Sequence, residues 1–318
     1  MIRRVLAALA ALSLASGAAA AYPEKPIRFV IPSAAGGSPD VLMRILMQEL
    51  SAQLGVVIVI ENKPGGSYVI GTMEIVRARP DGYTLGFGNI VSLATNQSLL
   101  ANVPYDVERD LTLVSNCVRV ANLLAVNKKL PVSSVQELIA YARKHPGKLV
   151  MASSGNGTTG HLGGELFKAM TGTFMLHVPY RGSPQAINDL IAGEANLMFD
   201  NLSSIAPHAK AGRVRGLGVS GPRRSPAFPE LPAIGEIVPG YEIIGWGGVI
   251  GPTGLPADVV TRLRAEIKKA LASAAVQERY KQLDTEADGG SPEEFLALAK
   301  RETAKWAEVV KRSGAKVD

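Results

Sequence analysis

The sequence predicts an α/β protein built from two similar domains. From Lys25 onward, short apolar runs rich in β-branched residues alternate with longer segments of helical period, which is typical of this class. The order strand, glycine loop, helix, strand occurs twice, about 120 residues apart, although no repeat is visible residue by residue. A chain of 318 residues is also long enough to divide into two domains.

The first of these units begins with a strand over residues 27–32 and a glycine loop over residues 34–37. We expect Ser38 to cap the next helix, Pro39 to begin it and Gly55 to end it. A second strand follows over residues 56–61. The apolar side of the helix consists of Leu42, Ile45, Leu46, Leu50 and Leu54.

The second unit repeats this order with a strand over residues 149–152 and a glycine loop over residues 153–160. Its helix is expected to run to Thr171 and to stop at Gly172, before a strand over residues 174–178. The apolar stripe of this helix is Leu162, Leu166, Phe167 and Met170.

We place the second domain at residues 123–245, between a first part of domain 1 at residues 22–122 and its return segment at residues 246–318. The return segment contains two predicted helices, over residues 258–272 and 292–312. Because this helix pair has little apolar surface of its own, we expect it to cover the first domain.

Three further helix starts are marked in the sequence. Ser134 with Glu137, and Ser291 with Glu294, have the spacing of a capping box. Ser183-Pro184 places proline at the first helical position. These are structural signals, and no function is assigned to them.

The first 21 residues have the layout of a cleaved signal peptide. Arg3 and Arg4 precede an apolar run of about ten residues, and small residues follow it. A bilayer span needs about twenty apolar residues. We therefore expect a secreted, periplasmic protein with no direct insertion into the membrane.

The composition argues against a nucleic-acid partner. Without Arg3 and Arg4 the chain has 32 basic and 28 acidic side chains, so the excess is small. Basic residues alternate with acids along the helices, and aromatic residues make up only 5% of the chain. The single cysteine, Cys117, lies in an apolar stretch and is expected to be a buried, inert thiol.

The sequence contains no catalytic or metal-binding constellation, so we expect no cofactor. The four histidines are far apart, and no CxxC, HExxH or GxSxG motif occurs. One dinucleotide motif is present, because Gly155, Gly157 and Gly160 form G-x-G-x-x-G between a strand and a helix. The next strand ends near Arg181 and offers no acidic residue to bind a ribose hydroxyl. Arg181 suits a phosphorylated ribose instead, so an exported NADP-dependent oxidoreductase is kept as an alternative.

Both glycine loops are suited to bind an anion. The start of a helix carries unpaired backbone N–H groups and about half a positive charge. In the first loop we expect donors near Ala35, Gly36 and Gly37, and in the second Thr158 and Thr159 add hydroxyl groups. If the two domains face each other, the loops can hold opposite ends of one small anion.

Several segments, in the same order along nearly the whole mature chain, resemble the Bug-type solute receptors of tripartite tricarboxylate transporters. In the first domain these segments are YPEKPIR (22–28), AGGSPD (35–40), ENKPGG (61–66) and ARPDGYT (78–84). In the rest of the chain they are GHLGGELF (160–167), VPYRG (178–182), LMFD (197–200), LPAIGE (231–236) and GPTGLP (251–256).

The resemblance implies a Venus-flytrap fold of the periplasmic binding protein type, with two α/β domains around a ligand cleft and a hinge of two crossing segments. It implies a non-enzymatic receptor for a small organic carboxylate, such as a dicarboxylic or tricarboxylic acid, an acidic amino acid or an aromatic acid. The partners implied are the membrane permease subunits of the transporter. A receptor that presents its ligand to a sensor kinase would have the same sequence features, and we expect a monomer.

By position, the resemblance also suggests which residues contact the ligand. In the second domain the glycine loop contributes Gly157 beside the two threonines. The full set is Ala35, Gly36, Gly37, Asp40 and Asn89 in the first domain, and Gly157, Thr158, Thr159, His161, Tyr180 and Asp200 in the second. Structural roles are the alternative for some of them: Asp40 and Asp200 as helix-start residues, His161 and Tyr180 as packed side chains.

Two positions depart from the family pattern. Ser33 stands where the family often has phenylalanine, so we expect a larger or wetter wall and include Ser33 among the ligand contacts. Pro39 stands where threonine or a similar residue is common and removes one N–H donor from the helix start.

Overall fold

A computed structural model describes residues 22–313, so the predicted signal peptide lies outside the described residues. The structure is α/β, with a ten-stranded sheet in that part of the chain, in the order β2-β1-β3-β9-β4-β7-β5-β6, to which β8 and β10 add through β4. The strands are β1 (Ile27–Ile31), β2 (Ile58–Asn62), β3 (Thr84–Asn89), β4 (Leu111–Val126), β5 (Val150–Ser153), β6 (Leu176–Pro179), β7 (Leu197–Asn201), β8 (Arg215–Val219), β9 (Ile244–Pro252) and β10 (Thr285–Ala287).

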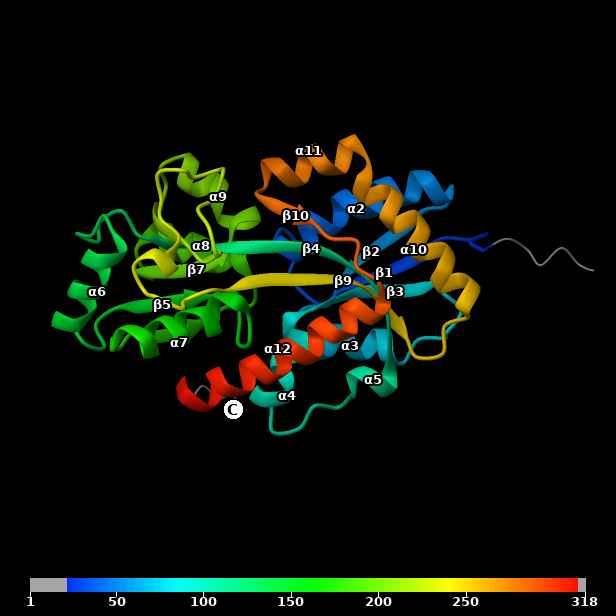
Figure 1. Ribbon diagram of the computed structural model, residues 1–318, viewed down its shortest axis with the longest axis horizontal. Helices are drawn as coiled ribbons and strands as arrows, with labels where there is room; N and C mark the ends of the chain where they lie inside the picture. Colours follow the sequence, from blue (N-terminus) through cyan, green and yellow to red (C-terminus); the bar gives the residue numbers. More distant parts are fainter. Residues whose placement is uncertain (1–21, 314–318) are drawn as a thin grey trace, which may run out of the picture.

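The sheet forms two lobes joined by β4 and β9, which run side by side between them (Figure 1). β4 pairs with β9 from Leu111 to Ala121 and with β7 from Asn122 to Val126. Lobe 1 contains the parallel strands β1, β2 and β3, and lobe 2 contains the parallel strands β5, β6 and β7. Two antiparallel strands therefore connect the lobes, as the resemblance implied for the hinge.

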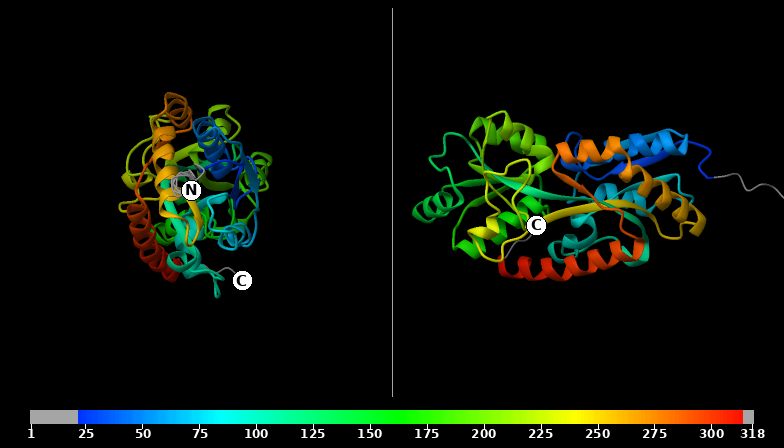
Figure 2. Two further views of the ribbon diagram at one scale, coloured as in Figure 1. Left: turned by 90° about the vertical axis from the view of Figure 1, so that its right-hand side faces the viewer. Right: turned by 45° about the horizontal axis from the view of Figure 1, so that its top comes forward.

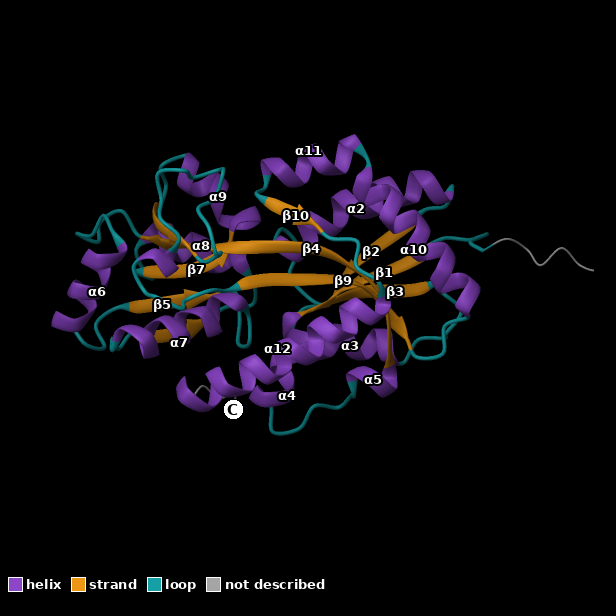
Figure 3. Cartoon of the chain, in the orientation of Figure 1, coloured by secondary structure: helices purple, strands orange, loops and turns teal. Residues whose placement is uncertain are grey.

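In lobe 1, helices cover both faces of the sheet (Figure 3). The helices α2 (Ser38–Leu54), α10 (Ala257–Ala272) and α11 (Ala274–Gln282) pack on one face and share a core with β1. The other face carries α3 (Val69–Val76), the π-helix η1 (Val91–Thr95) and α4 (Asn96–Leu99), with the short α5 (Val107–Asp110) before β4.

Lobe 2 follows the same layered plan. Its helices are α6 (Val135–Lys144), α7 (Thr159–Thr171), α8 (Ser183–Ala192), α9 (Leu202–Lys210) and the 3-10 turn η2 (Ile234–Glu236). Leu162 and Phe167 of α7 are buried, whereas Met170 is 38% exposed. The predicted apolar stripe is therefore only partly covered.

The last helix, α12 (Pro292–Ser313), extends along both lobes (Figures 1 and 2). It packs on η1 and α4 of lobe 1 and on α7 of lobe 2, and Trp306 is fully buried. This helix was expected to cover the first domain, and in the structure it also covers α7 of lobe 2. Helices α10 and α11 do pack on lobe 1, against α2.

The predicted strands and helices of both units are present, and Gly55 and Gly172 end their helices in the left-handed conformation at φ 69° and 62°. Ser38 is not the cap of α2. The helix begins at Ser38 with Gly37 before it, because the Ser38 hydroxyl bonds to Ser203 of lobe 2 instead of the helix backbone. Pro39 and Pro184 occupy the second helical position, one residue later than predicted.

The two predicted capping boxes differ. Ser291 and Glu294 exchange both hydrogen bonds. Ser134 accepts from the Glu137 N–H, but the Glu137 carboxylate binds the N–H and hydroxyl of Ser133. Cys117 is fully buried, and burial raises its pKa to about 12, as expected for an inert thiol.

The helices within residues 22–313 are all too short or too polar to cross a membrane.

Candidate functional site

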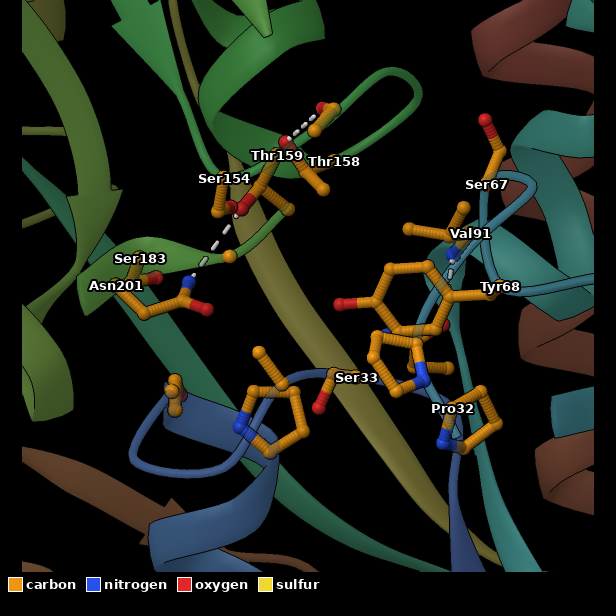
Figure 4. A pocket seen from close by; sticks show the side chains of 18 of the residues that line it. Pro32, Ser33, Ser67, Tyr68, Val91, Ser154, Thr158, Thr159, Ser183 and Asn201 are labelled. Atoms are coloured by element: carbon orange, nitrogen blue, oxygen red, sulfur yellow. Dashed lines mark hydrogen bonds between the residues drawn. The ribbon is translucent and has the colours of Figure 1, made fainter. Parts of the chain in front are cut away.

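A pocket of about 640 Å³ lies between the two lobes (Figure 4). Lobe 1 contributes Ser33, Ser67 and Tyr68 to its wall. Lobe 2 contributes Ser154, Thr158, Thr159 and Ser183. Trp246, at the start of the connecting strand β9, completes the wall. The lobes touch beside the pocket, where the Ser38 and Ser203 hydroxyl oxygens are 2.6 Å apart and the Thr95 hydroxyl donates to the Gly157 carbonyl at 3.1 Å.

Several helices begin at this pocket. The first residues of α2, α7 and α8, which are Ser38, Thr159 and Ser183, lie on its wall, as does Asn201, the N-cap of α9. Of the wall residues within 22–313, only Arg181 has a charged side chain, and it is exposed. The helix N-termini are therefore the main groups on the wall that favour an anion.

The first glycine loop is held from behind by Asp40. Gly36 lies at φ 78°, and its N–H donates to Asp40 Oδ2 at 2.9 Å. Asp40 Oδ1 accepts from Arg44 and Asn62, each at 2.9 Å. Burial raises the pKa of Asp40, but these three hydrogen bonds outweigh it and hold the pKa below its usual value. Asp40 is thus an ionised group that shapes the loop.

The second glycine loop is held in the same way by His161. Gly157 lies at φ 79°, and its N–H donates to His161 Nδ1 at 3.1 Å. The Thr158 hydroxyl accepts from the His161 N–H as the N-cap of α7 and donates to the Gly155 carbonyl at 2.7 Å. Thr159 Oγ1 donates to Asn122 Oδ1 at 3.1 Å.

Half of the twelve predicted contact residues lie on the pocket wall, namely Ser33, Gly37, Asn89, Thr158, Thr159 and Tyr180. Ala35 and Gly36 lie at the exposed tip of the first loop. The residues buried behind the wall are Asp40, Gly157, His161 and Asp200.

Two of the predicted residues on the wall also have structural hydrogen bonds. Asn89 accepts from the Val91 and Ser92 N–H groups at the start of η1, and Tyr180 donates to Asp189 at 2.6 Å.

Sequence analysis did not assign Tyr68, Ser183, Asn201 or Trp246 to the site. Tyr68 follows Gly65 and Gly66, and its φ of 71° is unusual for a residue with a side chain. Backbone strain of this kind collects at binding sites, but only the Pro-Gly-Gly turn before it is visible in the sequence. Ser183 was recognised only as a helix start.

Two wall residues have buried polar atoms without a hydrogen-bond partner among the described residues. They are the Ser33 hydroxyl and the Trp246 Nε1–H group. Such groups cost free energy unless a ligand or water satisfies them. Both atoms have almost no accessible surface, so they are polar groups packed within the wall and not groups open to the pocket.

Within residues 22–313, one group of three side chains has metal-ligand chemistry: His161, Glu165 and His177. The two imidazole rings are stacked, with centroids 4.1 Å apart and planes 16° apart. Each lone pair lies in its own ring plane, so the two nitrogens do not aim at one point. The Lys168 ammonium also binds Glu165 at 2.6 Å. These residues fit a packed hydrogen-bonded cluster and not a metal site.

This cluster predicts a loss of stability in acid. Burial, with nearby positive charge from Lys168, lowers the pKa of His161 to about 4 and that of His177 to about 3. Below about pH 6.5 the unfolded histidines bind protons that the folded ones do not, so each lowers the free energy of unfolding by up to about 1.4 kcal/mol per pH unit. We expect His177→Gln to reduce the slope of the free energy of unfolding against pH by about that amount between pH 6 and 4, as measured by urea unfolding. Equal slopes for the wild type and the variant would contradict a folded-state pKa of His177 that is lowered by burial.

The third glycine of G-x-G-x-x-G has a packing role. A Cβ atom at Gly160 would lie 2.3 Å from the Phe199 carbonyl oxygen of β7. Glycine at this position lets α7 pack directly on the strand, which explains the third glycine without a dinucleotide.

The sequence matches the model of the tripartite tricarboxylate transporter family receptor, TctC, over residues 42–315. The chain belongs to this family. An R. palustris protein solved with adipate is 38% identical, with a TM-score of 0.90 over 92% of this chain and 98% of that one. The periplasmic binding protein BugD is 32% identical, with a TM-score of 0.88 over 93% and 99% of the two chains.

MatC from Rhodopseudomonas palustris, solved with bound malate, is 26% identical to this TctC receptor, with a TM-score of 0.86 over 91% and 100% of the chains. The TctC family consists of periplasmic solute receptors and is not an enzyme family. The Venus-flytrap fold and the Bug-type resemblance are thereby confirmed. Family membership also removes the support for an exported oxidoreductase.

Proposed function

We propose that this TctC receptor binds a small organic carboxylate between its lobes and delivers it to the permease of a tripartite tricarboxylate transporter. The observation that carries the proposal is the convergence of the α2, α7 and α8 N-termini on one pocket with no buried basic side chain. Charge-assisted hydrogen bonds contribute about 1.5–3 kcal/mol each. Micromolar affinity corresponds to a binding free energy of about 8 kcal/mol. Four such hydrogen bonds are enough to support it after ordering losses.

The wall residues named above are the proposed ligand contacts. Gly37 and Ser33 act from lobe 1 and Thr158 and Thr159 from lobe 2, while Asp40 and His161 hold their loops in place. The structures solved with adipate and malate support an acid with more than one polar end. We keep the domain boundaries at 122/123 and 245/246 as proposals. β4 changes its sheet partner between Ala121 and Asn122, and β9 begins at Ile244, so each change lies within two residues of a boundary.

Thermal melting with a panel of acids tests this function. The panel contains adipate, malate, citrate, aspartate and benzoate, with NADP as the control. A ligand at 100 times its Kd adds about 2.7 kcal/mol, which is a rise in Tm of about 2–4 °C at this size. We expect at least one acid to raise Tm and NADP to leave it unchanged. Stabilisation by NADP and by no acid would refute the proposal.

A further inference from the structure

Asp200 is a buried carboxyl group directly behind the pocket wall. It lies near the end of β7, is 2% exposed and accepts a hydrogen bond from the Ser183 hydroxyl at 3.0 Å through Oδ1. Its other oxygen, Oδ2, has no partner among the described residues. Ser183 itself lies on the wall and is the first residue of α8 (Figure 4).

Among residues 22–313, no ion pair compensates a charge on Asp200. Burial raises its pKa to about 7 even though the Ser183 hydroxyl and the Asn201 N–H lower it. The charge of Asp200 also acts on Tyr68 of lobe 1. Burial raises the pKa of Tyr68 to about 12, a hydrogen bond with Asn89 opposes the rise, and the Asp200 charge adds to it. The other titratable groups on the elements that pack against β7 are Cys117, Arg119, His161, Glu165, Lys168, Asp189, His208 and Lys210.

The protonation of Asp200 decides what Ser183 offers to a ligand. When Asp200 is ionised, the Ser183 proton points at it, and only oxygen lone pairs face the pocket. These lone pairs and the charge behind them repel a carboxylate. When Asp200 is protonated, its O–H can donate to Ser183 Oγ, which frees the serine proton for the pocket.

We propose that Asp200 is a positioning residue that takes up one proton when a carboxylate binds, and thereby turns the Ser183 hydroxyl into a donor for the ligand. The inference rests on the proposed function of the same pocket. It predicts that the receptor captures its ligand more tightly in mildly acidic surroundings.

The wild-type protein should bind adipate, or whichever acid of the panel gives the largest shift, about tenfold more weakly at pH 8 than at pH 6. With a pKa of about 7, about 90% of Asp200 would be protonated at pH 6 and about 10% at pH 8, and the apparent Kd scales inversely with the competent fraction. Calorimetry at pH 8 in buffers of different ionisation enthalpy should show uptake of nearly one proton per ligand.

Two variants separate this role from a structural one. Asp200→Asn keeps the shape and can donate to Ser183, so it should bind at pH 6 and pH 8 with a Kd within about twofold of the wild-type value at pH 6. Ser183→Ala should bind more weakly at pH 6 and show a smaller pH dependence, because the Asp200 charge still acts on the ligand but no serine proton is turned toward it. Asp258→Asn, at an exposed site on α10, should behave as the wild type. Protonation of the ligand itself changes the Kd with pH equally for the wild type and all variants, so the comparison between them removes this effect.

Each result decides the inference. A wild-type Kd that is equal at pH 6 and pH 8, or a tenfold change that persists in Asp200→Asn, would overturn it while leaving the proposed function intact. If no acid of the panel binds, the proposed function fails, and this inference fails with it. Carbon NMR of the Asp200 carboxyl in the ligand-free protein gives a separate check, with an expected midpoint near pH 7 and a midpoint below pH 5 as the contradiction.

Discussion

Gly37→Asp is expected to weaken carboxylate binding by at least about a hundredfold while the protein stays folded. Gly37 lies on the pocket wall, immediately before α2, at φ −77° and ψ 168°, a conformation open to any residue. A Cβ atom there would lie 3.4 Å from the Ala34 carbonyl oxygen, so the side chain fits. Two like charges about 4 Å apart near a protein surface repel by about 4 kcal/mol. The Kd and the Tm are the two measurements.

Gly37→Asn is the matched control, because it has the same size and no charge. It should bind within about tenfold of the wild type. Equal losses for the two variants would show that the effect is steric and not electrostatic. The neighbouring Gly36 is a poorer site for this test, since it is exposed, lies at φ 78° and would strain with any side chain.

Gly160→Ala is expected to lower the free energy of unfolding by about 3 kcal/mol or more. The new methyl group would lie 2.3 Å from the Phe199 carbonyl oxygen, so α7 would have to move away from β7. Alanine gains about 1 kcal/mol in helix propensity over glycine, but overpacking against a backbone atom costs more. Urea unfolding at pH 7 measures the difference.

Gly163→Ala, in the same helix, separates the clash from general effects of substitution in α7. Its Cβ would lie 2.8 Å from Ile243 Cδ1 and 3.2 Å from the Tyr241 hydroxyl, which are side-chain ends and not backbone atoms. We expect a loss below about 1 kcal/mol. If Gly160→Ala were as stable as Gly163→Ala, the third glycine would not serve helix–strand packing.

The alternation of strands and helices was predictable because it depends on local patterns. Gly55 and Gly172 adopt the left-handed conformation that ends a helix, and the apolar side of α2 packs as its 3.6-residue period indicates. The two glycine loops were also correctly placed before their helices. Each of these features depends on residues that are close together in the chain.

The details of the pocket depend on contacts between distant segments. Ser38 was expected to cap its own helix, yet it bonds to Ser203, 165 residues away. Asp40 and His161 were expected at the ligand, but each turns inward to hold a glycine loop. Tyr68 and Trp246 reach the pocket only because the lobes close and β9 crosses between them. Periodicity and caps carry no information about such contacts.

A crystal structure of the protein grown with adipate shows where the acid binds. We expect one bound acid between the lobes, with a carboxylate at the N-termini of α2, α7 and α8 and within hydrogen-bond distance of Ser183. An acid bound elsewhere on the surface, with those helix starts in contact only with water, would contradict this expectation.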